Sequence, residues 1–391
     1  MCLRRDVGNL ITGKEKKALV VDDSAFMRKL ITDLLNSHPK IEVVGTARNG
    51  KDAIDKVKIL KPDVVTLDVE MPLMNGLEAL QEIMKQQPTP VVMLSSTTKT
   101  GAENTMLAMD YGAVDFIAKP GGAISLNLYD VKDEIIEKVY AASNVQISKL
   151  KQLKSVERIQ QETVKSEQSI SPIQPRQKLV ASEIVTPVKK GSLKKFSTRG
   201  KLFVMIGTST GGPRALQEVL TKLPKDIQAP ILVVQHMPPG FTKSLADRLD
   251  GFCEIHVKEA ENGELLENGT AYIAPGGKHL KIKKLGTSYY ARLDDIEPPR
   301  AGHRPSVNVL FESAAEIAGA RFLTVIMTGM GNDGMEGTAR LKELRETITI
   351  AESSETSVVY GMPRAIVDKG LADEVVKLTE IAATMNEIIL T

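Results

Sequence analysis

The chain alternates short apolar runs with amphipathic stretches, and it does so twice. In the first half, near-continuous apolar runs are separated by segments such as the one where Met27, Leu30, Ile31 and Leu34 recur at helical spacing. Apolar strands joined by amphipathic helices predict a parallel sheet with helices on both faces. We therefore expect a five-stranded doubly wound α/β domain, with strands at residues 18–21, 43–47, 64–67, 91–94 and 114–117. Ser24 is the expected N-cap of the first helix.

The same alternation resumes near residue 201 and predicts a second doubly wound, mostly parallel α/β domain. An antiparallel insertion is expected between Glu254 and Arg292. The expected strands cover residues 202–206, 231–234, 271–274, 281–285, 322–327 and 347–351. The expected helices cover residues 215–223, 242–249, 306–318 and 335–344, followed by a C-terminal helix.

A segment of different composition separates the two halves. Residues 148–199 are rich in Ser, Gln, Lys and Glu and contain Pro172, Pro175 and Pro187. A helix could continue to about residue 161, but beyond it the periodicity is lost, which favours disorder. We interpret the basic cluster at residues 189–195 as a solvated part of this linker, with contact to an acidic surface as the alternative. The predicted organisation is a disordered tail at 1–16, a first domain at 17–142, a linker at 143–200 and a second domain at 201–391.

Charge and composition argue against several classes of protein. A net charge of +2 over 391 residues does not suit a protein that binds nucleic acid over its whole surface. No apolar run approaches the roughly 20 residues of a membrane helix, so no membrane insertion is expected. Cys2 and Cys253 lie far apart, which favours a reducing compartment. The segment before Lys17 lacks a signal-peptide pattern. We expect a cytoplasmic protein.

Charged and hydroxyl side chains follow the predicted strands of the first domain. Asp22 and Asp23 follow the first strand, Asp68 the third, Ser95 the fourth and Lys119 the fifth. The carboxyl ends of parallel strands share one edge of the sheet, where ligands bind. Clustered carboxylates repel one another unless a cation lies among them, and their oxygens suit Mg²⁺. A carboxylate there could accept a phosphoryl group. An isolated aspartate at a strand end could instead be a simple N-cap.

In the second domain, a glycine-rich turn follows the first predicted strand. Residues 207–212 read Gly-Thr-Ser-Thr-Gly-Gly, which has the form G-x-S-x-G and would expose the Ser209 hydroxyl between a strand and a helix. A phosphate-binding loop is an alternative, although the P-loop lysine is missing because Pro213 and Arg214 follow the glycines. A purely structural turn is another. The motif alone does not decide among the three.

A nucleophilic serine needs a base and an orienting carboxylate. His236 directly follows the strand at 231–234 and leads the five histidines, while His303 is retained as a binding residue. His279 is assigned to a hairpin. Asp333 lies among glycines after the strand at 322–327, at the same expected edge of the sheet, although a simple N-cap would also explain it. The result is a Ser…His…Asp order that differs from that of α/β-hydrolases.

The motifs of the first domain resemble the receiver domain of response regulators. The matching segments are Val20 to Ser24, Leu67 to Pro72, Gly76, Ser95 and Lys119–Pro120. The resemblance implies that a histidine kinase phosphorylates Asp68. It also implies that Mg²⁺ is held by Asp23, Asp68 and the backbone carbonyl of Glu70, with Asp22 assisting.

The same resemblance implies a conformational switch in the first domain. Ser95 and Phe116 match the switch positions, where a hydroxyl moves toward the phosphate and an aromatic ring turns inward. Lys119 would neutralise charge on the transferring group, and the Lys119–Pro120 peptide bond is expected to be cis.

The motifs of the second domain resemble the chemotaxis protein-glutamate methylesterases. The matching segments are residues 207–213, 235–242, 303–307 and 327–334. The resemblance implies hydrolysis of glutamate methyl esters on chemoreceptors, with release of methanol, and deamidation of receptor glutamines. It implies Ser209 as nucleophile, His236 as general base and acid, and Asp333 as the residue that orients His236.

Further roles follow from the same resemblance. Thr210 and the backbone N–H near Met330 would stabilise the oxyanion, and Arg304 would face the substrate. No cofactor is implied at this second site. Asn308 departs from the family pattern, in which an aspartate is common at this position. The partners implied are chemoreceptors and a chemotaxis histidine kinase, and we expect a monomer.

The coexistence of both motif sets in one chain suggests control of the second domain by the first. Our hypothesis is that the unphosphorylated receiver covers the edge bearing Ser209 and that phosphorylation of Asp68 loosens this contact. A DNA-binding regulator is one alternative, but the second half offers no helix-turn-helix pattern. A non-enzymatic adaptor whose glycine-rich loops bind an acidic partner is the other.

Overall fold

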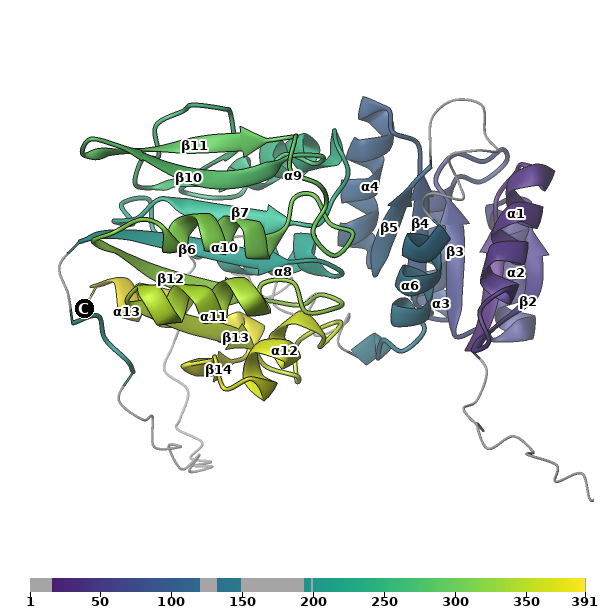
Figure 1. Ribbon diagram of the computed structural model, residues 1–391. Coiled ribbons are helices and arrows are strands. Elements are labelled where there is room, and N and C mark those ends of the chain that lie inside the picture. The colour runs from purple at the N-terminus through teal and green to yellow at the C-terminus, as the bar shows by residue number, and fades with distance from the viewer. Residues whose placement is uncertain (1–15, 120–131, 149–192, 198–199, 391) are drawn as a thin grey trace, which may run out of the picture. The chain divides into compact units, whose positions relative to one another are not determined.

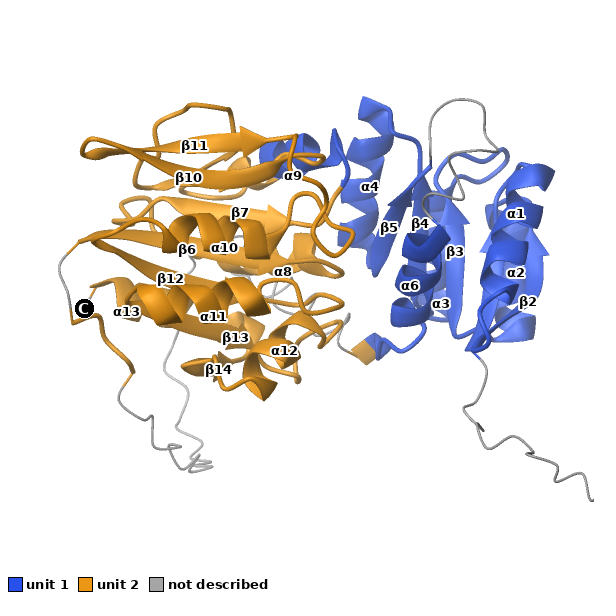
Figure 2. Ribbon diagram, in the orientation of Figure 1, with its two compact units in different colours: residues 1–147, 238–248 blue, residues 148–237, 249–391 orange. Residues whose placement is uncertain are grey.

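A computed structural model describes residues 16–119, 132–148, 193–197 and 200–390. The chain forms two compact units, residues 1–147 with 238–248, and residues 148–237 with 249–391 (Figure 2). The N-terminal tail and most of the predicted linker, including its possible helical extension, lie outside the described residues, as does Pro120. Within the linker, Lys194 is described, and its Nζ lies 2.9 Å from Asp373 Oδ1.

The first unit contains a five-stranded parallel sheet in the order β2-β1-β3-β4-β5, with helices on both faces (Figure 1). The strands are β1 (Lys16–Val21), β2 (Ile41–Ala47), β3 (Val64–Asp68), β4 (Val91–Ser95) and β5 (Asp115–Ala118). The helices before residue 143 are α1 (Ala25–Asn36), α2 (Gly50–Leu60), α3 (Gly76–Gln86), α4 (Lys99–Tyr111) and α6 (Lys132–Ala142). This confirms the predicted doubly wound sheet.

Local chemistry explains where these elements begin and end. Ser24 accepts a hydrogen bond from Met27 N, which confirms it as the N-cap of α1. All residues of β3 and β4 are buried, as expected for central strands covered on both faces. The order of the sheet places the ends of β1 and β3 side by side, because these two strands pair directly.

The second unit contains a seven-stranded parallel sheet in the order β14-β13-β12-β6-β7-β9-β8. Its strands are β6 (Lys201–Thr208), β7 (Ile231–Gln235), β8 (His256–Glu259), β9 (Thr270–Ile273), β12 (Ala320–Ile326), β13 (Thr347–Glu352) and β14 (Glu374–Val376). A separate antiparallel pair joins β10 (His279–Leu285) to β11 (Ser288–Asp294). The helices after residue 200 are α8 (Gly212–Leu220), α9 (Phe241–Asp250), α10 (Val307–Ala315), α11 (Met335–Leu344), α12 (Met362–Asp368) and α13 (Leu378–Leu390).

The predicted antiparallel insertion is only partly correct. β8 and β9 join the main sheet in parallel, beside β7, and only β10 and β11 form an antiparallel pair. β9 is buried throughout because strands flank it on both sides. Helix α8 begins at Gly212, earlier than predicted, because Pro213 suits the first turn of a helix. The short elements α12 and β14 were not predicted.

The core of the second unit lies on the central strands. Phe203 of β6 stacks on Phe322 of β12, with ring centroids 5.7 Å apart, and both side chains are fully buried. Burying one such side chain contributes about 1.5–3 kcal/mol. The paired strands β6 and β12 are therefore firmly held where their carboxyl ends meet. No helix in the described part of the chain is long and apolar enough to cross a lipid bilayer.

His279 begins β10 of the β10–β11 hairpin, as predicted, and is a buried polar link in this unit. Its side chain is fully buried, and Nδ1 accepts a hydrogen bond from Ser306 N at 3.2 Å. Nε2 lies 3.2 Å from the carbonyl oxygen of Pro298 and must donate to it. Burial lowers the pKa of His279, although the contact with Pro298 opposes the change. Protonation of Nδ1 would remove the acceptor for Ser306.

This link predicts a pH dependence of stability. An unfolded histidine takes up a proton near its ordinary pKa of 6.5, whereas folded His279 stays neutral to lower pH. The free energy of unfolding is therefore expected to fall as the pH drops below 6.5, by up to about 1.4 kcal/mol per pH unit. Chemical denaturation of His279→Gln is expected to show a flatter slope between about pH 5 and 6.5 and a constant offset above pH 8. Parallel curves for the two proteins would contradict this link.

Candidate functional site

Three carboxylates converge at the sheet edge of the first unit. Oxygen atoms of Asp22, Asp23 and Asp68 all lie within 4.8 Å of one another. Asp22 and Asp68 are almost completely buried, and Asp23 is exposed. Lys119 Nζ lies 2.9 Å from Asp22 Oδ2 and 2.7 Å from Asp68 Oδ2. The structure thus brings together the acidic residues and the lysine that the sequence assigned to this edge.

Burial and charge act in opposite directions on Asp68. Burial raises its pKa to about 6, with a further rise from the charge of Asp22, while Lys119 lowers it. The pKa of Lys119 is raised: burial alone would lower it, but the charges of Asp68 and Asp22 outweigh that effect. The three carboxylates of Asp22, Asp23 and Asp68 carry more negative charge than Lys119 can neutralise. This donor set fits a hard divalent cation such as Mg²⁺.

The other predicted residues of this unit surround the acidic cluster. The Ser95 hydroxyl is buried and donates to the Gly101 carbonyl at 2.9 Å. Phe116 is buried, and the Glu70 N–H donates to Asp68 Oδ1 at 3.3 Å. Movement of Ser95 toward Asp68 would therefore require its bond to Gly101 to break.

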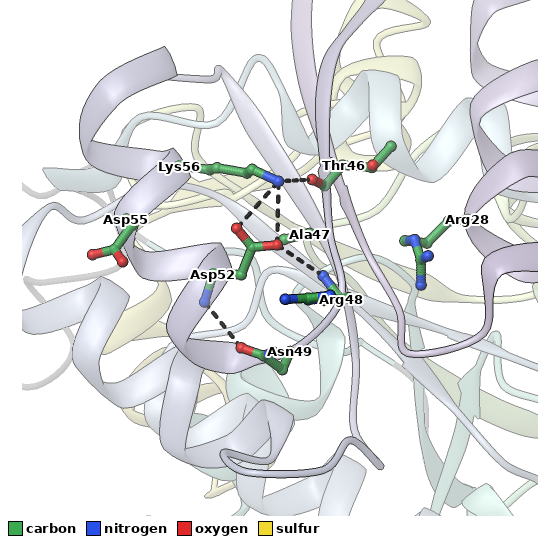
Figure 3. A pocket seen from close by; sticks show the side chains of 8 residues that line it. All are labelled: Arg28, Thr46, Ala47, Arg48, Asn49, Asp52, Asp55 and Lys56. Atoms are coloured by element: carbon green, nitrogen blue, oxygen red, sulfur yellow. Dashed lines mark hydrogen bonds and ion pairs between the residues drawn. The ribbon is translucent and has the colours of Figure 1, made fainter.

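A polar pocket of about 550 Å³ also lies on this unit, between the end of β2 and the start of α2 (Figure 3). Its lining residues are Arg28, Thr46, Ala47, Arg48, Asn49, Asp52, Asp55 and Lys56. Several of its polar groups bind one another: Asp52 contacts Lys56 at 3.1 Å, and Asn49 caps α2 through Asp52 N. None of the predicted site residues lines this pocket.

In the second unit, Ser209 lies on the turn between β6 and α8. Its N–H donates to the Thr328 carbonyl at 3.0 Å, and its carbonyl accepts a hydrogen bond from Gln235 Nε2 at 3.0 Å. Gly211 has φ of 79°, a conformation that favours glycine. Gly212 is equally constrained, because an added Cβ would lie 1.8 Å from Gln235 Oε1. The glycines predicted as a tight turn therefore serve both backbone shape and close packing.

Strand β7 pairs with β6, and Gln235 at the end of β7 lies opposite Thr208 at the end of β6. His236 is the next residue after Gln235. Its backbone N–H donates to the Thr208 carbonyl at 3.2 Å, which fixes it beside the Ser209 turn. The side chain is 7% exposed, and Nε2 lies 2.8 Å from Asp333 Oδ2. Nδ1 has no hydrogen-bond partner among the described residues. The nitrogen available for proton transfer is thus Nδ1.

Asp333 is held by five donors. Besides His236 Nε2, it accepts hydrogen bonds from Ser306 Oγ and from the backbone N–H groups of Val307, Asn308 and Gly334. Val307 and Asn308 begin α10, so the carboxylate satisfies N–H groups that a helix leaves unpaired. Burial alone would raise the pKa of Asp333, but His236 and these N–H groups outweigh it and lower the pKa to about 2. Asp333 is a permanent anion.

Asn308, which departs from the family pattern, has a clear structural partner. Its Oδ1 accepts hydrogen bonds from Gly334 N at 3.0 Å and Gly337 N at 2.8 Å, at the start of α11. Helices α10 and α11 are thus capped reciprocally, the first by Asp333 and the second by Asn308. A neutral amide provides this contact next to the anionic Asp333.

Two other predicted residues lie on the segment before α10. The His303 ring stacks on the His236 ring, with centroids 3.8 Å apart and an interplanar angle of 12°. Arg304 Nη1 donates to the carbonyls of Asp295 and Glu297 at 2.9 and 3.2 Å. His303 is therefore in direct contact with the proposed base. The side-chain hydrogen bonds of Arg304 within the described residues run to the 295–297 segment, and its carbonyl accepts from Gly277 N at 2.9 Å.

Sequence reasoning did not single out the residues that hold this site together. Gln235 binds the Ser209 carbonyl, Thr328 binds Ser209 N, and Ser306 binds Asp333. Only Gln235 gave a signal, as a polar residue at the end of an apolar strand next to His236. The arrangement of a turn serine, a histidine and a buried carboxylate, beside the N-terminus of α8, suits nucleophilic acyl transfer.

Comparisons with known proteins agree with this geometry. Residues 204–385 match the family model of the CheB methylesterase, and residues 18–127 match that of the response regulator receiver domain. A protein-glutamate methylesterase/protein-glutamine glutaminase of Geobacillus kaustophilus is 54% identical over 376 residues, covering 96% of this chain and 99% of its own. The protein of that name from Bacillus subtilis is 46% identical over 373 residues, covering 95% of this chain and 98% of its own.

The chain is also similar to a solved structure. The CheB methylesterase catalytic domain of Thermotoga maritima is 45% identical, with a TM-score of 0.46, and the match covers 49% of this chain and 99% of that one. The two curated relatives thus match nearly the whole chain. The chain belongs to the family of protein-glutamate methylesterases/protein-glutamine glutaminases, which joins a receiver domain to a methylesterase domain.

Proposed function

We propose that this protein is a phosphorylation-controlled serine esterase that hydrolyses glutamate methyl esters on chemoreceptors and deamidates receptor glutamines. The observation that carries the proposal is the buried His236–Asp333 pair, 2.8 Å long, next to the turn that bears Ser209. Family membership supports the substrate class. The proposed location is the cytoplasm, in keeping with two cysteines far apart in sequence, and the proposed form is a monomer.

The proposed reaction is acyl transfer through Ser209. The Ser209 hydroxyl loses its proton to His236 Nδ1 as its oxygen bonds to the γ-carbonyl carbon of the methylated glutamate. The C–O bond to methoxide then breaks, and the His236 proton leaves with it as methanol. Water, deprotonated by His236, attacks the acyl-enzyme and frees Ser209. For a glutamine substrate, the leaving group is ammonia.

Asp333 supports both steps. Its fixed anion keeps the proton of neutral His236 on Nε2 and stabilises the imidazolium that forms when Nδ1 is protonated. Thr210 and the backbone N–H of Met330 are proposed to meet the oxyanion. Arg304 is proposed to contribute to substrate binding by fixing the 295–297 segment through its side-chain hydrogen bonds.

The first domain is proposed to be the switch. A histidine kinase would donate a phosphoryl group to Asp68, and Asp22, Asp23, Asp68 and the Glu70 carbonyl would hold Mg²⁺. The cation would supply charge neutralisation for the transferring phosphoryl group. Ser95, Phe116 and Lys119 would respond to the new phosphate. The proposed domain bounds of 17–142 and 201–391 enclose both matched family regions.

Ser209→Ala is the direct test of the esterase proposal. Loss of the nucleophile is expected to lower the release of methanol from methyl-labelled receptor by at least about 10³-fold. Ser288→Ala, on the β10–β11 hairpin, is the matched control and is expected to retain the wild-type rate. Retention of activity by a folded Ser209→Ala variant would reject the nucleophile assignment.

Asp333→Asn tests the orienting carboxylate. In this variant an amide NH₂ group takes the place of Oδ2 and cannot accept the hydrogen bonds from His236 Nε2 and Val307 N. His236 therefore loses the contact that fixes its tautomer. The expected kcat for methanol release is about 10²- to 10⁴-fold lower. Asp294→Asn is a suitable control, because Asp294 also accepts from Lys281, Ile296 N and Glu297 N but does not contact His236. Equal losses in the two variants would argue for a purely structural effect.

Asp68→Asn tests control by phosphorylation. Addition of a small phosphodonor is expected to raise the esterase rate of the wild-type chain, and the ratio of rates with and without phosphodonor is expected to fall to about 1 in Asp68→Asn. Asp55→Asn, which changes an exposed carboxylate of α2, is expected to keep the wild-type ratio. Stimulation of Asp68→Asn to the same degree would exclude Asp68 as the phosphorylation site.

A further inference from the structure

Thr328 connects more parts of the esterase site than any residue that the sequence had singled out. It lies just past β12, is 1% exposed, and uses its N–H, its carbonyl and its hydroxyl in hydrogen bonds to three other segments. A buried threonine often serves only to pack the interior of a sheet. The partners of Thr328 are therefore the informative observation.

The carbonyl of Thr328 fixes the nucleophile turn. It accepts hydrogen bonds from Ser209 N at 3.0 Å and from Thr208 Oγ1 at 2.9 Å. The Ser209 N–H is therefore already used. An oxyanion formed at Ser209 would therefore be bound by other N–H groups near this turn.

The hydroxyl of Thr328 fixes the Thr210–Gly211 peptide group. Oγ1 accepts a hydrogen bond from Val359 N at 3.0 Å, and its own proton has a close acceptor in the Thr210 carbonyl at 2.8 Å and a more distant one in the Val359 carbonyl at 3.4 Å. In a planar trans peptide, the N–H points opposite to the carbonyl. A fixed Thr210 carbonyl therefore also fixes the direction of the Gly211 N–H, at the N-terminus of α8.

This peptide is tightly enclosed but keeps an available donor. A Cβ added to Gly211 would lie 2.8 Å from Val358 Cβ and 3.2 Å from Thr328 Oγ1, so the side chain of Thr328 packs directly against it. Neither Gly211 N nor Met330 N donates a hydrogen bond to another residue that the structure describes. Both N–H groups are thus available to an oxyanion formed near Ser209.

Thr328 itself is anchored to the sheet. Its N–H donates to Glu352 Oε2 at 2.8 Å, and Glu352 is fully buried at the end of β13. A hydrogen bond in the protein interior is electrostatically stronger than the same bond in water. Thr328 is therefore held from one side while it holds the nucleophile turn on the other.

We propose that Thr328 is a positioning residue for the esterase reaction, whose hydroxyl sets the Thr210–Gly211 peptide so that its N–H meets the oxyanion. This inference rests on the proposed function of Ser209. Thr328 does not touch the substrate. It acts through the geometry of the Thr210–Gly211 peptide, one position beyond the peptide that directly follows Ser209, because preset donors need no rearrangement when negative charge develops.

The test compares three variants of the full chain, assayed with phosphodonor by methanol release from methyl-labelled receptor. Thr328→Val keeps the shape and removes the hydroxyl, and kcat is expected to fall about 10- to 100-fold with KM changed less than about threefold. Thr328→Ser restores the hydroxyl and is expected to recover kcat to within about threefold of wild type. Thr324→Val is the matched control, because Thr324 is a fully buried residue of β12, the strand that precedes Thr328, and its hydroxyl bonds to Thr349 Oγ1.

The outcomes separate positioning from structure. A folded Thr328→Val with wild-type kcat, or a Thr324→Val that loses as much kcat as Thr328→Val, would overturn the proposal. If Thr328→Val does not fold, Thr328→Ala replaces it under the same criteria, and failure of Thr328→Ser to keep kcat would likewise overturn it. Full activity of Ser209→Ala would instead reject the underlying esterase proposal, whatever Thr328 does.

Discussion

The pairing of β6 with β12 is the interaction on which the second unit depends. These strands are about 120 residues apart in sequence, yet they pair along seven positions and carry the Phe203–Phe322 contact. Their register places Thr208 and Ser209 next to Thr328, and β7 on the other side of β6 brings His236 to the same edge. A shift of one residue in this register would turn every buried side chain of the strand to the opposite face. The relative positions of the site residues therefore depend on the strand pairing in the core of this unit.

The two buried aspartates of the chain illustrate how surroundings determine what a carboxyl group can do. Asp333 receives five hydrogen bonds, and its pKa falls to about 2, whereas burial dominates at Asp68 and its pKa rises to about 6. The first environment suits a permanent anion next to a histidine. The second leaves a carboxylate poorly solvated, which is a favourable starting state for a group proposed to form a new covalent bond.

Much of the fold followed from simple rules. Apolar alternation indicated both parallel sheets, and the rule that ligands bind beyond strand ends placed Asp22, Asp23 and Asp68 together, which the structure confirms. The same rule placed Asp333 at the edge of Ser209 and His236. Their catalytic roles and that of Asp68 stay predictions. Periodicity could not show that β8 and β9 run parallel to the main sheet, because a short apolar run has no direction.

The supporting contacts could not be predicted for a different reason. Thr328 and Asn308 act through hydrogen bonds to residues 24 to 120 positions away, and no local pattern encodes such partners. His279 carried a turn-like local sequence and is nevertheless fully buried, since α10 and the segment before it pack over it. Tertiary contacts decide these positions, and they do so only after the sheet has formed.

The order of strands in the second sheet has a consequence for how activity first arises in the cell. β6 and β7 emerge early, but β12 and Asp333 follow only after a further 80 or more residues, and β13 with Glu352 later still. The entropy cost of closing so long a loop arises before the contacts at its ends contribute any stabilisation. A nascent or partly folded chain therefore contains Ser209 and His236 without their supports. The proposed catalytic set of Ser209, His236 and Asp333 is therefore complete only in a chain whose second sheet has formed.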